Sequence, residues 1–288
     1  MSAQSRIKKS SLAKRNIHKF MKNKLAIVGL FILLFFTICA IFAPLLTPHD
    51  PSFVNPSQRL LPVSIDHPLG TDNAGRDTFT RLLYGGRISI AVGLSAALGS
   101  AIIGCLLGCL AGYYGGRLDS FIIYVCEIFT TFPQIMLVLI LVGLSGRSLI
   151  NLVLIFCFTG WMGTTRLVRS KVLSLKTEPF VESCQANGIS GASIMFNHIL
   201  PNTLGPVIVA ITMQTAGFVL AEAALSFLGM GVPTSIPTWG NVINAAASFN
   251  IFQNYPVLWI APGIVISLFV LGVNFFGDGL RDVFDATQ

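Results

Sequence analysis

Two acidic residues lie within long apolar regions of the sequence. Glu222 is in the region 204–228, and Glu127 is in the region 121–144. A charged side chain at the centre of a bilayer costs about 2.5 to 3.5 kcal/mol on insertion scales, so each carboxylate is expected to face protein or water. Glu222 therefore belongs either to a polar pathway between helices or to a packing contact that small neighbours such as Ala223 allow. Both interpretations stay open, and Glu127 is a second candidate for the pathway.

Other residue patterns that could support chemistry are incomplete. Cys105 and Cys109 share a helix face, but no histidine or acidic residue adjoins them, so packing is expected in place of metal binding. Gly143-Leu144-Ser145-Gly146 resembles the G-x-S-G motif of rhomboid-type intramembrane proteases, yet the only later histidine, His198, falls outside the apolar regions. The sequence has no phosphate-binding loop and no H-E-x-x-H zinc motif. The chain is therefore not expected to be an enzyme or to bind a metal or cofactor itself.

The composition predicts an all-α integral membrane protein. Hydrophobic residues make up 53% of the 288 residues, charged residues make up 11%, and the mean hydropathy is +0.74. A helix needs about 20 residues to cross the hydrocarbon core, so about six crossings fit this length. Gly104, Gly108 and Gly112 recur every fourth residue and predict a close packing seam between two helices. The expected spans are residues 25–46, 88–111, a segment within 121–144 that is kinked at Pro133, 149–165, 204–228 and 258–276.

The distribution of charge predicts the orientation in the membrane. The formal net charge is +7, and residues 1–24 carry eight Lys and Arg residues with no acidic residue among them. Basic residues concentrate on the cytoplasmic side, so 1–24 is expected inside, followed by a retained anchor and not by a cleaved signal peptide. The segment 47–87 then lies outside, and the tail 278–288 returns to the cytoplasm. Membrane orientation accounts for the basic excess, so nucleic acid is not an expected partner.

The longest polar interval in the second half of the chain is residues 177–202. Thr177 or Glu178 can cap a helix whose first residue is Pro179, where the missing N–H costs nothing, and Gly188 suits the end of that helix. The interval therefore begins with one short helix between two membrane spans.

A second short helix is expected to follow within the same interval. Ser190 can cap it, it runs toward His198, and Pro201 should stop or kink it. The result is a bent protrusion of two short helices. Its first helix presents a small apolar face that suits docking into a groove of another protein, and this face comprises Phe180, Val181 and Cys184.

The same interval carries a recognisable pattern. Glu182-Ser183-Cys184, then Gly188, then Leu200-Pro201 resembles the cytoplasmic E-A-A, G, L-P signature of membrane subunits in ATP-binding-cassette importers. Ser183 and Cys184 depart from the usual alanines, but both are small, so the close-packing reason for alanine is kept.

Further motifs extend this resemblance over nearly the whole chain. Together they are similar to the permeases of dipeptide, oligopeptide and nickel importers, and most of all to the second of the two permease subunits. Glu127 stands where that family more often has aspartate. The motifs are H-P-L-G-T-D-N-A-G-R-D at 67–77, Y-G-G-R at 84–87, A-G-Y-Y-G-G at 111–116, H-I-L-P-N at 198–202, E-A-A-L-S-F-L-G at 222–229, P-T-W-G at 237–240 and G-D-G-L-R-D at 277–282.

The resemblance implies a type I importer permease fold in the bacterial cytoplasmic membrane, with a core at 88–277 and a cytoplasmic coupling loop at 166–203. It also implies four kinds of partner: a homologous permease, two ATP-binding subunits that hold ATP and Mg²⁺, an extracytoplasmic solute-binding protein, and the lipid bilayer. The residues that it assigns to coupling with the ATPase are Pro179, Phe180, Glu182, Cys184, Gly188, His198, Leu200 and Pro201.

The cargo that the resemblance favours is peptide, with nickel or a metal-chelator complex as the alternative. A secondary transporter is a further alternative, but such proteins usually show inverted repeats, and no such repeat is evident in this sequence.

Overall fold

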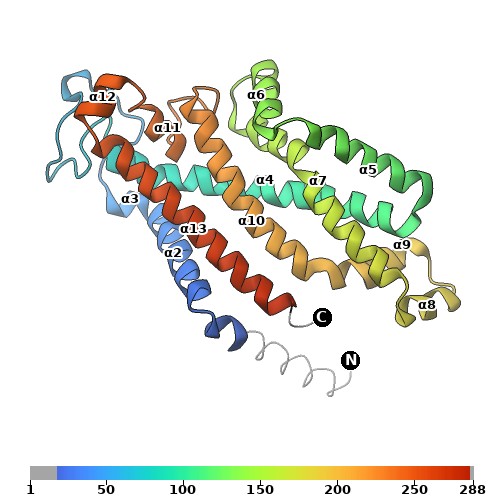
Figure 1. Ribbon diagram of the computed structural model, residues 1–288. Coiled ribbons are helices and arrows are strands. Elements are labelled where there is room, and N and C mark those ends of the chain that lie inside the picture. The colour runs from blue at the N-terminus through green and yellow to red at the C-terminus, as the bar shows by residue number, and fades with distance from the viewer. Residues whose placement is uncertain (1–17, 286–288) are drawn as a thin grey trace.

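The computed structural model describes residues 18–285, and within them every named element is a helix (Figure 1). Five of these helices are long and apolar enough to cross a membrane, and the number is six if the bent pair α5–α6 counts as one span. The prediction of an all-α membrane protein with about six spans is therefore confirmed. The elements are α2 (Lys24–Ile41), α3 (Ala43–Leu46), η1 (Pro56–Gln58), α4 (Thr78–Tyr114), α5 (Gly116–Thr131), α6 (Gln134–Ser145), α7 (Leu149–Lys176), α8 (Pro179–Ala186), α9 (Gly191–Ser193), η2 (Ile194–Ile199), α10 (Leu200–Phe227), α11 (Trp239–Asn244), α12 (Phe249–Asn254) and α13 (Val257–Asp285).

Helix α4 is the longest element and packs against α7, α10 and α2. A Cβ atom built on Gly104 would lie 2.6 Å from the Thr164 side chain, and one on Gly108 would lie 2.7 Å from the carbonyl oxygen of Thr165. Gly112 faces Val172 in the same way. The glycine seam predicted from the sequence is confirmed, because only bare backbone allows α4 and α7 to approach this closely.

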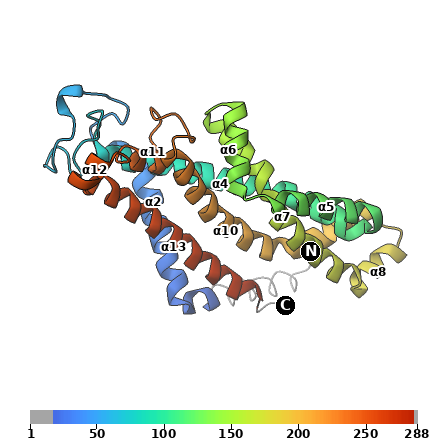
Figure 2. The same ribbon diagram turned by 45° about the horizontal axis from the view of Figure 1, so that its top comes forward.

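Helices α2 and α13 form a second pair that lies side by side in both views (Figures 1 and 2). Gly29 of α2 and Gly272 of α13 meet at their closest approach, where a Cβ on Gly29 would be 2.6 Å from the Gly272 carbonyl oxygen. Arg87 of α4 donates through Nε to the carbonyl oxygen of Ala40 at 2.5 Å, at the C-terminal end of α2. This pair is thereby fastened to α4.

Several helices extend beyond the spans predicted from hydrophobicity. The expected loop 47–87 ends at Asp77, because the Asp77 side chain caps α4 by accepting from the N–H of Thr80, so residues 78–87 are helical. Helix α7 continues to Lys176 and α13 continues to Asp285, so the expected tail 278–288 is not separate up to residue 285. A hydropathy pattern marks the part of a helix in hydrocarbon, whereas the helical hydrogen bonds continue past it. Residues 1–17 of the predicted basic segment, and residues 286–288, lie outside the described residues.

The region 121–144 contains the kink that Pro133 predicts. Helices α5 and α6 are bent by 87° relative to each other, and Phe132 between them has the extended conformation that a residue before proline favours. Helix α6 has 12 residues and is about 18 Å long at 1.5 Å per residue, so α6 alone is too short to cross a bilayer.

The long helices alternate between two ends of the molecule. One end holds the segment 47–77 with α11 and α12, and the other end holds α8 together with the free ends of α2 and α13 (Figures 1 and 2). This arrangement fits the predicted topology, in which the protrusion and both termini share one side of the membrane.

Candidate functional site

The protrusion between α7 and α10 begins with α8. Glu178 occupies the N-cap position in an extended conformation but makes no side-chain capping bond, and Pro179 is the first helical residue, as predicted. Gly188 ends this turn with a φ of 74°, and the N–H of Ile189 donates back to the carbonyl oxygen of Cys184. A glycine is needed at 188 because this left-handed conformation is strained for other residues.

Two of the three residues of the apolar face of α8 pack toward the protein body. Val181 is fully buried, at 0% exposed, in a cluster with Val172, Ile194 and Ile199, and Cys184 packs against the same cluster. The expectation that Val181 faces a partner is therefore wrong, while the coupling role of the partly buried Cys184 stays a prediction. A helix of eight residues cannot remain folded alone, and it uses these side chains to attach itself to the body.

The outer surface of α8 offers an aromatic and an acidic side chain. Phe180 is 39% exposed, and Glu182 is exposed with no ion-pair partner among residues 18–285. Ser183 bonds back to the carbonyl oxygen of Pro179. Phe180 and Glu182 thus remain available to another protein, and the candidates Pro179 and Pro201 are exposed as well.

The second half of the protrusion is not a separate helix. Ser190 caps it as predicted, accepting from the N–H of Ser193, but the chain then passes through the π-helical turn η2 directly into α10. The N–H of Leu200 donates to the carbonyl oxygen of Met195, five residues earlier. This wider turn leaves room for the Pro201 ring, which would clash with a carbonyl in a regular α-helix. His198, Leu200 and Pro201 therefore belong to one continuous helix over Gly191–Phe227, which corrects the predicted stop near Asn202.

Residues from α4 and α7 hold the protrusion in place. Lys176, at the end of α7, donates through Nζ to the carbonyl oxygen of Tyr113 at 2.6 Å and lies 5.5 Å from the centre of the Tyr113 ring. A Cβ on Gly191 would lie 3.0 Å from that same ring. The sequence did not reveal that Tyr113 supports the protrusion, although the A-G-Y-Y-G-G motif at 111–116 contains Tyr113. A groove of about 570 Å³ adjoins the protrusion and is lined by Lys171, Ser174, Leu175, Glu178, Pro201, Asn202, Gly205, Pro206 and Phe284.

A bidentate ion pair fixes α5 to α7 close to this end. Arg169 donates through Nε and Nη2 to the two carboxylate oxygens of Asp119, at 2.5 and 2.6 Å. Paired guanidinium–carboxylate geometry of this kind sets orientation as well as adding energy.

Glu222 lies in a closed hydrogen-bonded cluster. Its carboxylate is 0% exposed and accepts from Ser89 Oγ at 3.0 Å and from Ser226 Oγ at 2.8 Å. Ser89 Oγ in turn accepts from the backbone N–H of Trp239 at 3.1 Å, so the cluster joins α4, α10 and α11. Glu127 lies exposed on α5 and does not join this cluster. This geometry is the one expected from the packing interpretation of Glu222, while a role of Glu222 or Glu127 in transport stays a prediction.

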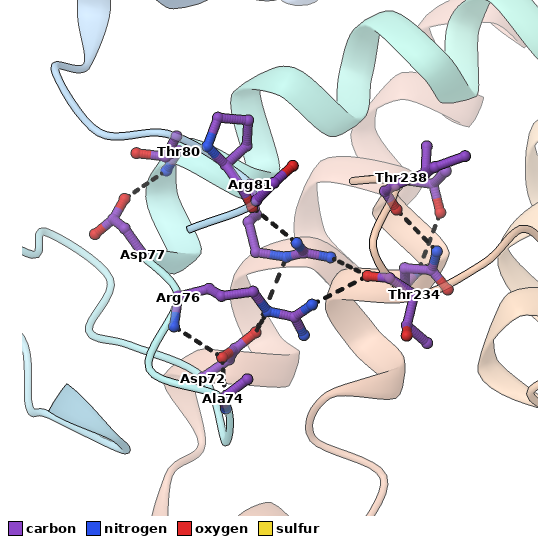
Figure 3. Close-up of polar contacts among 12 residues, drawn as sticks. Asp72, Ala74, Arg76, Asp77, Thr80, Arg81, Thr234 and Thr238 are labelled. Carbon is purple, nitrogen blue, oxygen red and sulfur yellow. Dashed lines mark hydrogen bonds and ion pairs between the residues drawn. The ribbon is translucent and has the colours of Figure 1, made fainter. Parts of the chain in front are cut away.

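A second polar cluster joins the segment 47–77, which lies at the opposite end of the molecule from α8 (Figure 1), to the loop after α10 (Figure 3). Arg76 Nη1 and Arg81 Nη2 both donate to the carbonyl oxygen of Thr234 at 3.0 Å, and Arg81 Nη1 donates to the carbonyl oxygen of Pro51 at 2.9 Å. Asp72 pairs with Arg76 at 2.7 Å. Arg81 is only 1% exposed, so these bonds fasten the segment 47–77 to the loop between α10 and α11.

Three side chains of ligand type meet beside this cluster. His49, His67 and Asp77 have ligand atoms that all lie within 4.8 Å of one another. His67 Nδ1 is 2.9 Å from Asp77 Oδ2, while Asp77 Oδ1 accepts from the N–H of Thr80. Hydrogen bonds within the protein already account for the side chains of His67 and Asp77. We therefore assign these side chains to the fold of the segment 47–77.

Comparison with known proteins identifies the family of the chain. Residues 104–287, more than half of the chain, match the family described as binding-protein-dependent transport system inner membrane component. The chain belongs to this family. Residues 11–62 of the permease also match the N-terminal TM domain of oligopeptide transport permease C.

Relatives of the permease match along almost its full length. The permease is 45% identical over 264 residues to the dipeptide transport system permease protein DppC of Alkalihalophilus pseudofirmus, covering 92% of this chain and 86% of that protein. It is 39% identical to the dipeptide transport system permease protein DppC of Bacillus subtilis, covering 93% and 83% of the two chains. It is 36% identical to the oligopeptide transport system permease protein OppC of the same organism, covering 96% and 90%. The resemblance inferred from the sequence motifs is confirmed.

Proposed function

We propose that this permease is the membrane-spanning subunit of an ATP-driven, binding-protein-dependent importer and forms half of a translocation path for peptides. The relatives named dipeptide and oligopeptide permeases support peptide as the cargo. The observation that carries the coupling role is the protrusion, which leaves Phe180 and Glu182 exposed while its other face is anchored in the body.

The proposed assembly contains four further protein subunits. A homologous permease completes the path, two ATP-binding subunits hold ATP and Mg²⁺, and a solute-binding protein delivers peptide from outside. The absence of a phosphate-binding loop in this chain supports separate ATPase subunits. The permease lies in the bacterial cytoplasmic membrane with both termini and α8 in the cytoplasm.

The protrusion acts as a lever between the ATPase and the path. When the ATPase subunits close on ATP, a groove on one of them moves α8 through Phe180 and Glu182. The movement passes from α8 into the adjoining α7, into α4 through the Lys176–Tyr113 contact, and into α10 through the continuous helix over Gly191–Phe227. The permease pair then changes between inward-facing and outward-facing states.

Two alternatives have less support. Nickel or metal-chelator import was the second cargo predicted from the sequence, but the relatives compared above are named for dipeptides and oligopeptides. A secondary transporter would need no ATPase partner and no protrusion shaped for one.

Reconstitution tests the proposal directly. The permease is purified with the subunits that co-assemble with it, placed in proteoliposomes, and supplied with the solute-binding protein and a labelled dipeptide or tripeptide. We expect uptake that requires both ATP and the binding protein. ATP-independent uptake would support a secondary transporter, and ATP-dependent uptake of ⁶³Ni²⁺ without peptide uptake would support the nickel alternative.

A further inference from the structure

A small polar cleft lies between α6, α7 and α10, away from both the protrusion and Glu222. Its volume is about 140 Å³, and it is lined by Gln134, Gly160, Gln214, Gly217 and Phe218. We call it the glutamine cleft. Gln134 is exposed, whereas Gln214 is partly buried and its Oε1 is fully buried, and burying an unpaired amide group costs several kcal/mol in an apolar solvent.

The chain itself satisfies these two carboxamides only in part. Gln214 Nε2 donates to the carbonyl oxygen of Gly160 at 3.0 Å, but Gln214 Oε1 is buried and has no partner within residues 18–285. Gln134 Nε2 reaches the carbonyl oxygen of Thr159 at the long distance of 3.3 Å. An acceptor that is buried without a donor costs about 1 to 3 kcal/mol, so a ligand that brings an N–H group into this cleft gains that energy back.

Glycines leave bare backbone along the same cleft. Gly217 lies one helical turn after Gln214, so both residues are on one face of α10, and a Cβ on Gly217 would meet no atom within 4 Å. Gly163, one turn after Gly160 on α7, does not line the cleft, but a Cβ there would also meet no atom within 4 Å. The main chain of a ligand can therefore approach both helices closely, whereas Gly160 itself is covered by Phe218.

The size and charge of the cleft indicate the part of a ligand that it suits. Ligand pockets usually enclose about 300 to 1,000 Å³, so a cleft of 140 Å³ takes only a fragment of a ligand. The cleft has no charged side chain in its lining. It offers acceptors and a donor for an amide, but no pocket for a side chain.

We propose that the glutamine cleft binds the main-chain amides of a peptide in transit. Gln214 Oε1 accepts an N–H of the peptide, Gln134 provides a second amide contact, and Gly217 gives the peptide backbone room. Recognition of main-chain groups alone suits a path that passes peptides of many sequences. This inference rests on the proposed function, and it names the substrate contact within the path that this subunit contributes.

Substitutions in the assembled importer test the proposal. Gln214→Leu removes the acceptor while keeping an apolar side chain of similar size, and we expect peptide uptake to fall about tenfold, as for one lost hydrogen bond to a buried group. Gly217→Val fills open space and should fold normally, so a fall in its uptake reports a blocked cleft. Gln253→Leu is the matched control, because Gln253 is exposed on α12, and it should keep wild-type uptake.

N-methylated peptides separate a substrate contact from a structural effect. A peptide methylated at one amide nitrogen, and still bound by the solute-binding protein, cannot donate to Gln214. We expect methylation to slow uptake by the wild type but to have little further effect on Gln214→Leu. Equal sensitivity of both proteins to methylation, or wild-type uptake by Gln214→Leu and Gly217→Val, would overturn the inference alone. A wild-type importer that takes up no peptide would overturn the proposed function together with it.

Discussion

Glu222 illustrates how a carboxylate can be accommodated inside a bundle of apolar helices. Two serine hydroxyls, from α4 and from α10 itself, donate to it, and Ser89 also accepts from the N–H of Trp239. Removal of the carboxylate leaves two buried hydroxyls without an acceptor, and the backbone at the start of α11 loses a fixed partner. The residue therefore holds α4, α10 and α11 together by hydrogen bonds that a sequence pattern does not reveal.

We expect Glu222→Leu to destabilise the permease by about 1 to 3 kcal/mol, since it strands these hydroxyls, and we expect Glu222→Gln to have a smaller effect. The measurement is the melting temperature of the detergent-solubilised importer. Glu127→Gln is the control, because Glu127 is exposed on α5. If Glu222→Gln instead abolishes uptake while the melting temperature stays unchanged, the transport interpretation of this residue is correct.

Glu182 is a residue-level test of coupling. Because its side chain is exposed and has no ion-pair partner in the described part of the chain, Glu182→Ala should leave the fold of the permease intact. We expect uptake, and ATP hydrolysis stimulated by the binding protein, to fall at least about tenfold, as when one partner of a charged contact is removed at an interface. Gln185→Ala, on the same exposed helix, is the matched control. Unchanged stimulation in Glu182→Ala would show that α8 does not use this carboxylate.

At the scale of elements, the sequence predicts the long helices well because each is an uninterrupted apolar run. Their ends are predicted less well, since they depend on local bonds. Asp77 starts α4 ten residues before the expected second span, and α7 continues past the expected end at residue 165 to Lys176. Neither extension changes the hydrophobic pattern, so hydropathy alone cannot detect it.

The protrusion was predicted in outline but not in its connections. Pro179, Gly188 and Ser190 have the local roles that their residue types predict. The π-helical turn before Pro201 was missed, because a proline normally indicates a helix start or break and gives no sign of a wider turn. The inward direction of Val181 was also missed. The spacing of apolar residues defines a face of a helix, but it does not show whether the same protein or a partner covers that face. The glutamine cleft was missed for a similar reason, since its residues come from three helices.

The glycine seam between α4 and α7 allows an element-level prediction. Gly108→Val places a side chain where a Cβ would already lie 2.7 Å from the carbonyl oxygen of Thr165, so the two helices must separate. We expect a loss of at least about 1 to 3 kcal/mol, seen as a lower melting temperature and a low yield of assembled importer. Gly143→Ala on α6 is the control, because its Cβ would meet only Met230 Cε at 3.8 Å. Normal assembly of Gly108→Val would mean that the seam is not closed in the assembled protein.

At the scale of the whole molecule, polar bonds concentrate at the two ends. At one end, Arg81 and Arg76 connect the segment 47–77 to the loop after α10, and at the other end Lys176 and the Asp119–Arg169 pair brace the protrusion. The helices between them pack mainly through apolar side chains and glycines. In the proposed coupling mechanism, we expect these bonds to make a push on α8 tilt whole helices, because they tie the helix ends to their neighbours.

This mechanism requires the two ends to lie on opposite sides of the membrane. In a variant whose six cysteines are replaced, Ile65→Cys and Ala192→Cys place single thiols at exposed positions, with Ile65 99% exposed at one end and Ala192 at the other. We expect a membrane-impermeant maleimide to label Ile65→Cys in spheroplasts, whereas Ala192→Cys should react only after permeabilisation. The basic residues near the protrusion and in the N-terminal segment favour this orientation. Labelling of Ala192→Cys in intact spheroplasts would place α8 outside, where no ATP-binding subunit could push it, and the coupling role of the protrusion would fail even if the permease still carried peptides.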